Sequence, residues 1–142
     1  AMGAIATGPG GRCPRLLFRL HPGKNIGSAE CVAFLEQLSL NFPGRKIFVI
    51  WDGLRAHESK KVKSWVSKHR RFELFKLPPY APELNPIEYG WGHIKFHQLA
   101  NLAPESEAEL FIHAKAAICR LRRSPELLKS FLRHAPINFF AL

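Results

Sequence analysis

Aspartate is almost missing from this sequence, since Asp52 is the only one among 142 residues. Cysteine is also scarce: Cys13, Cys31 and Cys119 stand alone, with no Cys-x-x-Cys pair. An odd number of widely spaced cysteines argues against a disulfide framework, and the missing pair argues against a structural zinc site. No apolar run approaches the roughly 18 residues of a membrane helix. We therefore expect reduced thiols and no membrane partner.

Acidic residues are outnumbered, with 11 Asp+Glu against 21 Lys+Arg and a net charge of +10. Such an excess favours a polyanion partner, because basic side chains placed on phosphates release condensed counterions. A merely well-solvated surface is the alternative. Residues 55–76 hold eight basic residues and two acids, so the charge is concentrated there. The chain begins without the layout of a signal peptide. We expect DNA as the partner and a cytoplasmic, nucleoid-associated location.

Strand and helix patterns alternate along the chain, which predicts an α/β domain. The expected elements are strands over residues 4–7, 12–20, 46–51 and 72–77, and helices over 28–41, 58–69, 86–100, 106–122 and 125–133. The first two strands should form a hairpin. The continuous apolar run at 46–51 is typical of a central strand buried on both faces. With no repeat or linker, the sequence predicts a single domain over residues 1–142.

Two acidic residues occupy positions that suit catalysis. Asp52 directly follows the strand over 46–51, and the carboxyl ends of strands are where α/β sheets bind ligands. The alternative is that Asp52-Gly53 is only a turn dipeptide. Glu88 lies in the first turn of the helix that follows a proline-rich loop. Its alternative is structural, because Asn85 and Glu88 have the spacing of a capping box.

Together these carboxylates point to metal-dependent chemistry. Mg²⁺ and Mn²⁺ prefer oxygen ligands, and paired ions about 4 Å apart can bind the attacking and leaving oxygens of a phosphodiester. Such a site needs about three carboxylates to neutralise two divalent cations. Glu83 is nearby, but the prolines around it make it a poor ligand. The sequence thus offers Asp52 and Glu88 as catalytic and metal-binding residues.

Two stretches of sequence carry a specific resemblance. The segment 51–57 (WDGLRAH) and the segment 77–91 (LPPYAPELNPIEYGW), followed by Lys95, resemble the second half of a DDE superfamily endonuclease. The similarity is to bacterial insertion-sequence transposases related to the mariner group. It implies an RNase H-like (retroviral-integrase-like) fold, a mixed sheet flanked by helices, that cuts and joins DNA with Mg²⁺ or Mn²⁺. Asp52 then matches the second acid of the family and Glu88 the third.

The resemblance also implies DNA contacts and one loss. The DNA-contacting candidates are Arg55, His57, Lys60, Lys61, Lys63 and Lys95. His57 can instead be an ordinary helix-entry residue, and Lys95 an ordinary surface lysine. The family's first acid lies on an earlier strand, and this chain has no second aspartate to supply it. We therefore expect an N-terminally truncated, partial DDE-type catalytic domain, weak or inactive as a nuclease. A missing strand exposes a sheet edge, so we also expect a homodimer formed by strand pairing or domain swapping.

Two other hypotheses stay open beside the enzyme. The chain is either a transposase relic that binds DNA through its basic regions without cutting it, or a purely structural fragment that oligomerises. DNA binding that depends strongly on salt distinguishes the relic from the structural fragment. Metal-dependent nicking of DNA distinguishes the enzyme from both.

Overall fold

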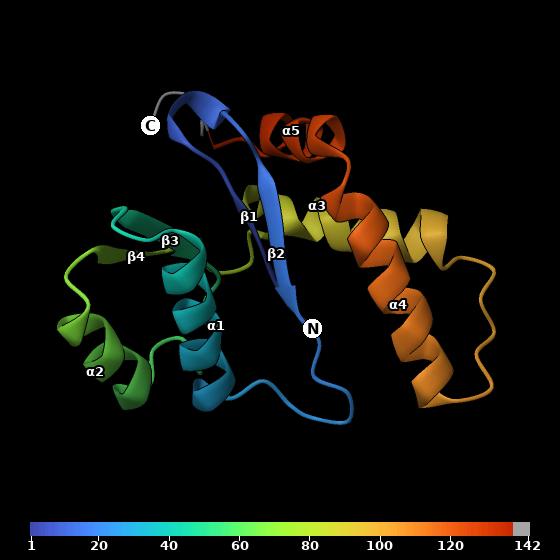
Figure 1. The fold of residues 1–142 in the computed structure, drawn as a ribbon, viewed down its shortest axis with the longest axis horizontal. Coiled ribbons are helices and arrows are strands. Elements are labelled where there is room, and N and C mark those ends of the chain that lie inside the picture. Colours follow the sequence, from blue (N-terminus) through green and yellow to red (C-terminus); the bar gives the residue numbers. More distant parts are fainter. Residues whose placement is uncertain (138–142) are drawn as a thin grey trace. The chain divides into compact units, whose positions relative to one another are not determined.

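A computed structural model describes residues 1–137 of the chain (Figure 1). The chain divides into two compact units. One unit joins the N-terminal stretch Ala1–Pro22 to the chain from Pro82 onward, and the other is the continuous segment Gly23–Ala81. They are called here the split unit and the continuous unit. Asp52 belongs to the continuous unit and Glu88 to the split unit.

The split unit begins with the predicted hairpin. Strands β1 (Met2–Ala6) and β2 (Arg15–Arg19) pair antiparallel. The short 3₁₀ segment η1 (Pro9–Gly11) turns the chain between them, with Gly10 and Gly11 both at positive φ. Glycine adopts that backbone region without steric cost, so the glycine-rich turn makes the hairpin possible. The hairpin prediction is confirmed, with strands shorter than expected.

Helices make up the rest of the split unit. After the 3₁₀ segment η2 (Pro82–Leu84) come α3 (Pro86–His93), the π-helical segment η3 (Ile94–Gln98), α4 (Glu107–Arg122) and α5 (Pro125–His134). The helix expected over 86–100 is therefore α-helical only as far as His93. Ser106 begins α4 as its cap, its hydroxyl accepting from the Glu109 N–H at 3.1 Å. None of the helices within residues 1–137 combines the length and the apolar character that crossing a membrane requires.

The core of the split unit lies between β2, α3, α4 and α5. Its buried members are Leu16, Ile87, Ile94, Ala117, Ile118, Leu121, Leu128 and Phe131. Trp91 packs against this core. A Cβ atom on Gly3 of β1 would lie only 2.6 Å from the Trp91 ring. The hairpin can therefore approach α3 this closely only because residue 3 has no side chain.

The continuous unit contains α1 (Ser28–Asn41), β3 (Ile47–Trp51), α2 (Lys60–Lys68) and β4 (Phe72–Lys76). Strands β3 and β4 pair in parallel, and α2 makes the crossover between them. Helix α1 has the predicted bounds, and Gly27 occupies its N-cap position. The Glu30 carboxylate accepts from the Gly27 N–H at 2.9 Å and satisfies this end of the helix.

Strand β3 is less buried than its apolar sequence predicts. Its five residues are half-buried or exposed, and the Phe48 side chain is 57% exposed. Within residues 1–137 β3 pairs with β4 alone, so each sheet has two strands. The prediction of a central strand buried on both faces is therefore wrong. The expected antiparallel and parallel pairings both occur, but in two separate sheets.

Arg71 closes the C-terminal end of α1 within the continuous unit. Its guanidinium donates to the carbonyl oxygens of Ser39 (2.8 Å) and Arg45 (3.2 Å), and it also bonds the Phe42 carbonyl and the Ser39 hydroxyl. The last carbonyls of a helix lack partners within the helix, and a cation there also complements the helix dipole. This residue of the basic segment therefore has a structural role.

Candidate active site

Asp52 directly follows β3, as the sequence predicts. Its carboxylate is 60% exposed, and Oδ1 accepts from the Leu54 N–H at 3.1 Å. An aspartate that bonds the backbone two residues later forms an Asx turn, so the turn interpretation of Asp52-Gly53 also holds. The turn leaves the carboxylate accessible to solvent while fixing one of its oxygens.

His57 supports Asp52 from the following turn. Its ring stacks on the Trp51 ring, with centroids 4.1 Å apart and planes 6° from parallel, and its side chain is only 10% exposed. Nδ1 lies 3.1 Å from Asp52 Oδ1 and 3.1 Å from the Asp52 carbonyl oxygen. A proton on Nδ1 is therefore shared between these two acceptors. The predicted contact of His57 with DNA stays a prediction, but its contact with Asp52 gives it a positioning role.

Two neighbours shape the surroundings of Asp52. Lys76 of β4 crosses Gly53, where a Cβ atom would meet its Cε at 3.1 Å, and it forms an ion pair with Glu58. The hydrogen bond from Lys76 and then its charge lower the pKa of the Glu58 carboxyl.

Burial raises the pKa of the Cys31 thiol in α1, and the charges of Glu30 and Asp52 add to that rise. Cys31 is therefore a protonated, structural thiol at neutral pH.

Glu88 lies in the first turn of α3, and its side chain is exposed. Its N–H donates to the Asn85 carbonyl at 3.0 Å, but the Asn85 side chain makes no capping hydrogen bond. The Asn85 half of the predicted capping box is therefore not formed. The favourable position of a carboxylate near a helix N-terminus still applies.

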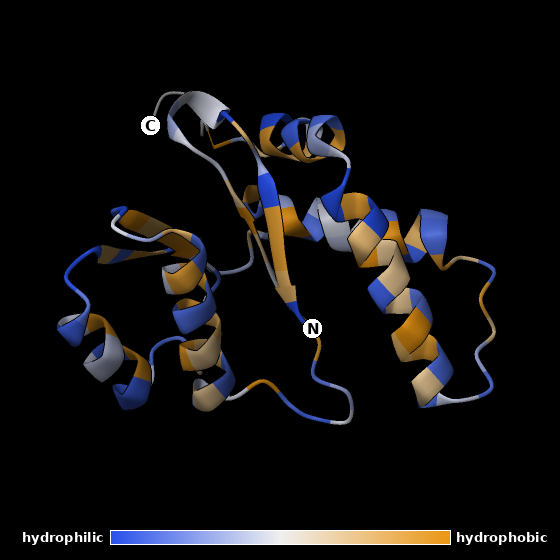
Figure 2. Cartoon of the chain, viewed as in Figure 1, coloured by the Kyte–Doolittle hydropathy of each residue, from blue (hydrophilic) through white to orange (hydrophobic). Residues whose placement is uncertain are grey.

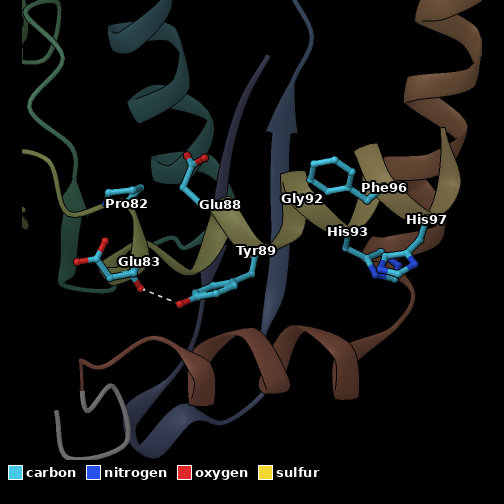
Figure 3. A pocket seen from close by; sticks show the side chains of 8 residues that line it. All are labelled: Pro82, Glu83, Glu88, Tyr89, Gly92, His93, Phe96 and His97. Carbon is cyan, nitrogen blue, oxygen red and sulfur yellow. Dashed lines mark hydrogen bonds between the residues drawn. The ribbon is translucent and has the colours of Figure 1, made fainter. Parts of the chain in front are cut away.

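A pocket of about 420 Å³ lies along α3 in the split unit (Figure 3). Its lining residues are Pro82, Glu83, Glu88, Tyr89, Gly92, His93, Phe96 and His97. The Tyr89 hydroxyl donates to the Glu83 carbonyl at 3.1 Å and ties the proline-rich loop to the helix. In Figure 3 the Glu88 carboxylate and the Tyr89 ring point to opposite sides of α3.

Both candidate acids have donor chemistry that fits a hard cation. Mg²⁺ keeps several waters and is usually held by one or two carboxylates, and exposed carboxylates on defined elements meet that need. Asp52 ends a strand, and Glu88 belongs to a helix whose neighbouring residues Ile87 and Gly90 are buried. In the described part of the chain, no group of three or more His, Cys, Asp or Glu side chains is arranged to enclose a metal.

The predicted DNA-contacting lysines of the continuous unit are exposed on α2. Lys60, Lys61 and Lys63 occupy its first turns, where no acidic residue is present. Cations at a helix N-terminus oppose the helix dipole, so this placement costs stability and favours an anionic partner. Figure 2 shows hydrophilic residues along α2 and hydrophobic ones in β3 and β4. Arg55 is also exposed, in the turn before α2.

Lys95 of the split unit is exposed in η3, with Nζ 5.3 Å from the centroid of the Phe96 ring. Four lining residues of the pocket were not predicted from the sequence: Tyr89, His93, Phe96 and His97. The spacing of the two histidines, four residues apart in an expected helix, was the available clue, because such residues share a face. The tyrosine and phenylalanine carried no comparable clue.

Solved structures of one transposase share this fold. The Mos1 transposase catalytic domain, solved with raltegravir and Mg, aligns at a TM-score of 0.64 and 17% identity. The alignment covers 89% of this chain and 65% of that one. A Mos1 transposase paired-end complex with the left transposon end aligns at a TM-score of 0.53 and 18% identity. That alignment covers 87% of this chain and 40% of the other. The RNase H-like fold of a transposase catalytic domain is thereby confirmed.

Sequence comparison gives the family. The model of the DDE superfamily endonuclease matches residues 16–110, about two thirds of the chain and including both Asp52 and Glu88. The chain belongs to this family. The Tcb2 transposase of Caenorhabditis briggsae is 37% identical over 54 residues, which is 38% of this chain and 19% of that protein. The chain thus spans a fifth of that relative and less than two thirds of the matched Mos1 domain.

Proposed function

We propose that this chain is the catalytic-core part of a DDE-type DNA transposase, acting over residues 1–142 as a single, partial catalytic domain. In this proposal Asp52 is the second acid and Glu88 the third, and both hold Mg²⁺ or Mn²⁺. The observation that carries the proposal is Asp52 itself. The only aspartate of the chain is exposed at the end of β3, held by His57, inside the segment that matches the family.

Bound ions of this kind activate a water molecule and stabilise the charge that develops on a phosphodiester. The chain's own part is to present the ligands in fixed orientations. Leu54 N–H and His57 both contact Asp52 Oδ1, and they leave its other oxygen for a cation. Glu88 is presented by the first turn of a helix whose adjacent residue Ile87 is buried. Neither carboxylate needs to be extracted from an apolar interior before it binds a metal.

Cleavage by this chain should be weak or absent. Two divalent cations need about three carboxylates, and the family's first acid has no aspartate to represent it here. The alternative is a relic that binds DNA or oligomerises without cutting. The basic turn before α2 and the lysines of α2 favour retained DNA affinity, whatever the state of the acids.

A homodimer belongs to the same proposal. Strand β3 pairs on one side only within the described residues, and the exposed Phe48 adds apolar surface to this sheet. An open edge with apolar side chains favours pairing with a second copy of the chain. The paired-end complex of the Mos1 transposase supports DNA as the partner.

The test of catalysis is plasmid nicking in Mn²⁺, using the wild type, Asp52→Asn and Glu88→Gln. We expect weak nicking by the wild type and none by either variant, because each loses a charged metal ligand. Glu83→Gln is the matched control, since it removes a carboxylate of the same pocket and should keep the wild-type level. A wild type that binds DNA without nicking it establishes the relic instead. Nicking that survives both substitutions contradicts the assignment of the acids.

The DNA interface is tested by measuring the affinity for duplex DNA at several salt concentrations. Each phosphate contact contributes about 0.9 to the slope of log affinity against log salt. Replacing Lys60, Lys61 and Lys63 together by alanine should lower the slope by up to about 3. Lys129→Ala is the control, because Lys129 Nζ is paired with Glu126 at 2.8 Å. An unchanged slope in the triple variant would remove α2 from the interface.

A further inference from the structure

Two histidines of the split unit lie side by side where α3 passes into η3. His93 is the last residue of α3, and His97 lies one turn later in η3. Their ring centroids are 5.0 Å apart, with planes inclined at 34° (Figure 3). The Leu99 N–H donates to the Ile94 carbonyl at 2.9 Å, which marks the wider π-helical turn. Such π-helical turns are frequently found at functional sites.

The spacing of the rings suits a shared metal ion. Two imidazoles bound through nitrogen at about 2.1 Å to one tetrahedral ion have ring centroids about 5 Å apart. The packed conformation already has this separation. His93 is half-buried, and its ring lies 6.1 Å from that of the buried Phe131, so one ligand is held by the core. His97 is exposed and can adjust to the ion.

The chemistry of the pair selects a different kind of ion from the carboxylates. Imidazole suits Zn²⁺, Ni²⁺, Co²⁺ and Cu²⁺, whereas Mg²⁺ prefers oxygen. Burial, and next the charge of His97, lower the pKa of the His93 imidazole. In the region from residue 1 to 137, no third His, Cys, Asp or Glu completes a metal-binding group with the pair.

We propose that His93 and His97 form a two-imidazole site for a borderline divalent transition-metal ion such as Ni²⁺, Co²⁺ or Zn²⁺. Water or a ligand from solution fills the other coordination positions, which open into the pocket. The site goes beyond the proposed function and does not rest on it, because neither histidine belongs to the proposed acid site. Two protein ligands make it a weak, exchangeable site and not a structural one.

The experiment is a calorimetric titration of Ni²⁺ into the untagged chain at pH 7.5 with excess Mg²⁺ present. Every protein tested carries Cys13→Ser, because the exposed Cys13 thiol is another ligand for such ions. We expect one site per chain, with the affinity lowered about tenfold or more in both His93→Ala and His97→Ala. The Mg²⁺ should not compete, because it takes oxygen ligands.

The matched control is His113→Ala. His113 is also exposed on a helix and lies 3.8 Å from Glu109 one turn earlier, which makes that pair the competing explanation. Unchanged Ni²⁺ affinity in the control, with loss in both test variants, supports the proposal. Loss in the control, or full affinity in His97→Ala, overturns it. The His97 ring is exposed, so its removal leaves the fold intact and the test decisive even where His93→Ala unfolds.

Discussion

The two units of this chain hold their candidate acids by different means. Glu88 of the split unit belongs to a helix whose neighbouring residues are buried among α4, α5 and the hairpin. Asp52 of the continuous unit ends a two-stranded sheet whose first strand is half-buried or exposed throughout. Its orientation comes from the Leu54 N–H and the stacked, bonded ring of His57. The helix that carries Glu88 is held by apolar packing, and the Asp52 carboxylate is held by short-range polar contacts.

The surroundings of the two candidate acids are therefore sensitive to different kinds of substitution. Packing distributes its contribution over many side chains, so the position of α3 depends on the whole core. Polar contacts concentrate it in a few residues, so the surroundings of Asp52 depend on single side chains. Substitutions in the two units therefore test this difference by their effects on stability.

The largest effect is expected from the core of the split unit. Leu128 is completely buried, so Leu128→Ala should lower the free energy of unfolding by about 3 kcal/mol through lost apolar burial and a cavity. Chemical denaturation measures this change. Phe48→Ala in the continuous unit is the comparison, and it should cost less than about 1 kcal/mol because that side chain is mostly exposed. Equal losses would show that β3 is as tightly packed as the core.

An intermediate effect is expected at the arginine that closes α1. Arg71→Ala removes several charged hydrogen bonds and leaves carbonyls at the helix end without partners, at a cost of about 2 kcal/mol. Thermal unfolding in parallel with the neighbouring Arg70→Ala isolates the effect, since Arg70 is exposed. If both variants melt together with the wild type, polar contacts do not stabilise the continuous unit as argued.

The smallest effects on stability are expected from substitutions at two glycines of the split unit. Gly3→Ala forces a methyl group against the Trp91 ring and should destabilise the chain by about 1.5 kcal/mol. Gly92→Ala has open space around its Cβ atom and lies inside α3, so it should stabilise by up to about 1 kcal/mol. Differential scanning calorimetry should show a lower melting temperature for Gly3→Ala and a higher one for Gly92→Ala. A shift in the same direction would mean that the hairpin does not pack closely on α3.

Much of the fold followed from local patterns in the sequence. Apolar periodicity, caps and glycine-proline turns located the hairpin, α1, α2, α4 and α5, because these are properties of neighbouring residues. The burial of β3 did not follow. A run such as 47–51 shows that both faces of a strand are apolar, but it does not say whether another strand or helix covers them. The break between α3 and η3 at Ile94 also had no local sign.

The site divides along the same line. Asp52 and Glu88 were proposed because each lies at the end of an element. The family match covers the segment that contains them, and their role as metal ligands stays a prediction. His57 contacts Asp52, and Arg71 bonds the C-terminal end of α1. Both depend on contacts made only in the folded chain, which composition and spacing do not reveal. The pocket is tertiary for the same reason. Among the pocket residues, only His93 and His97 have a spacing that predicts a shared helix face.

The contact between Gly3 and Trp91 has an evolutionary consequence. A rigid indole 2.6 Å from the place of a missing methyl group couples two positions that are far apart in the sequence. A side chain at position 3 requires a smaller ring at position 91, so position 91 is expected to change first. Among homologues these positions should therefore change together, and their covariation would record the docking of the hairpin on α3 long after the rest of the surface has diverged.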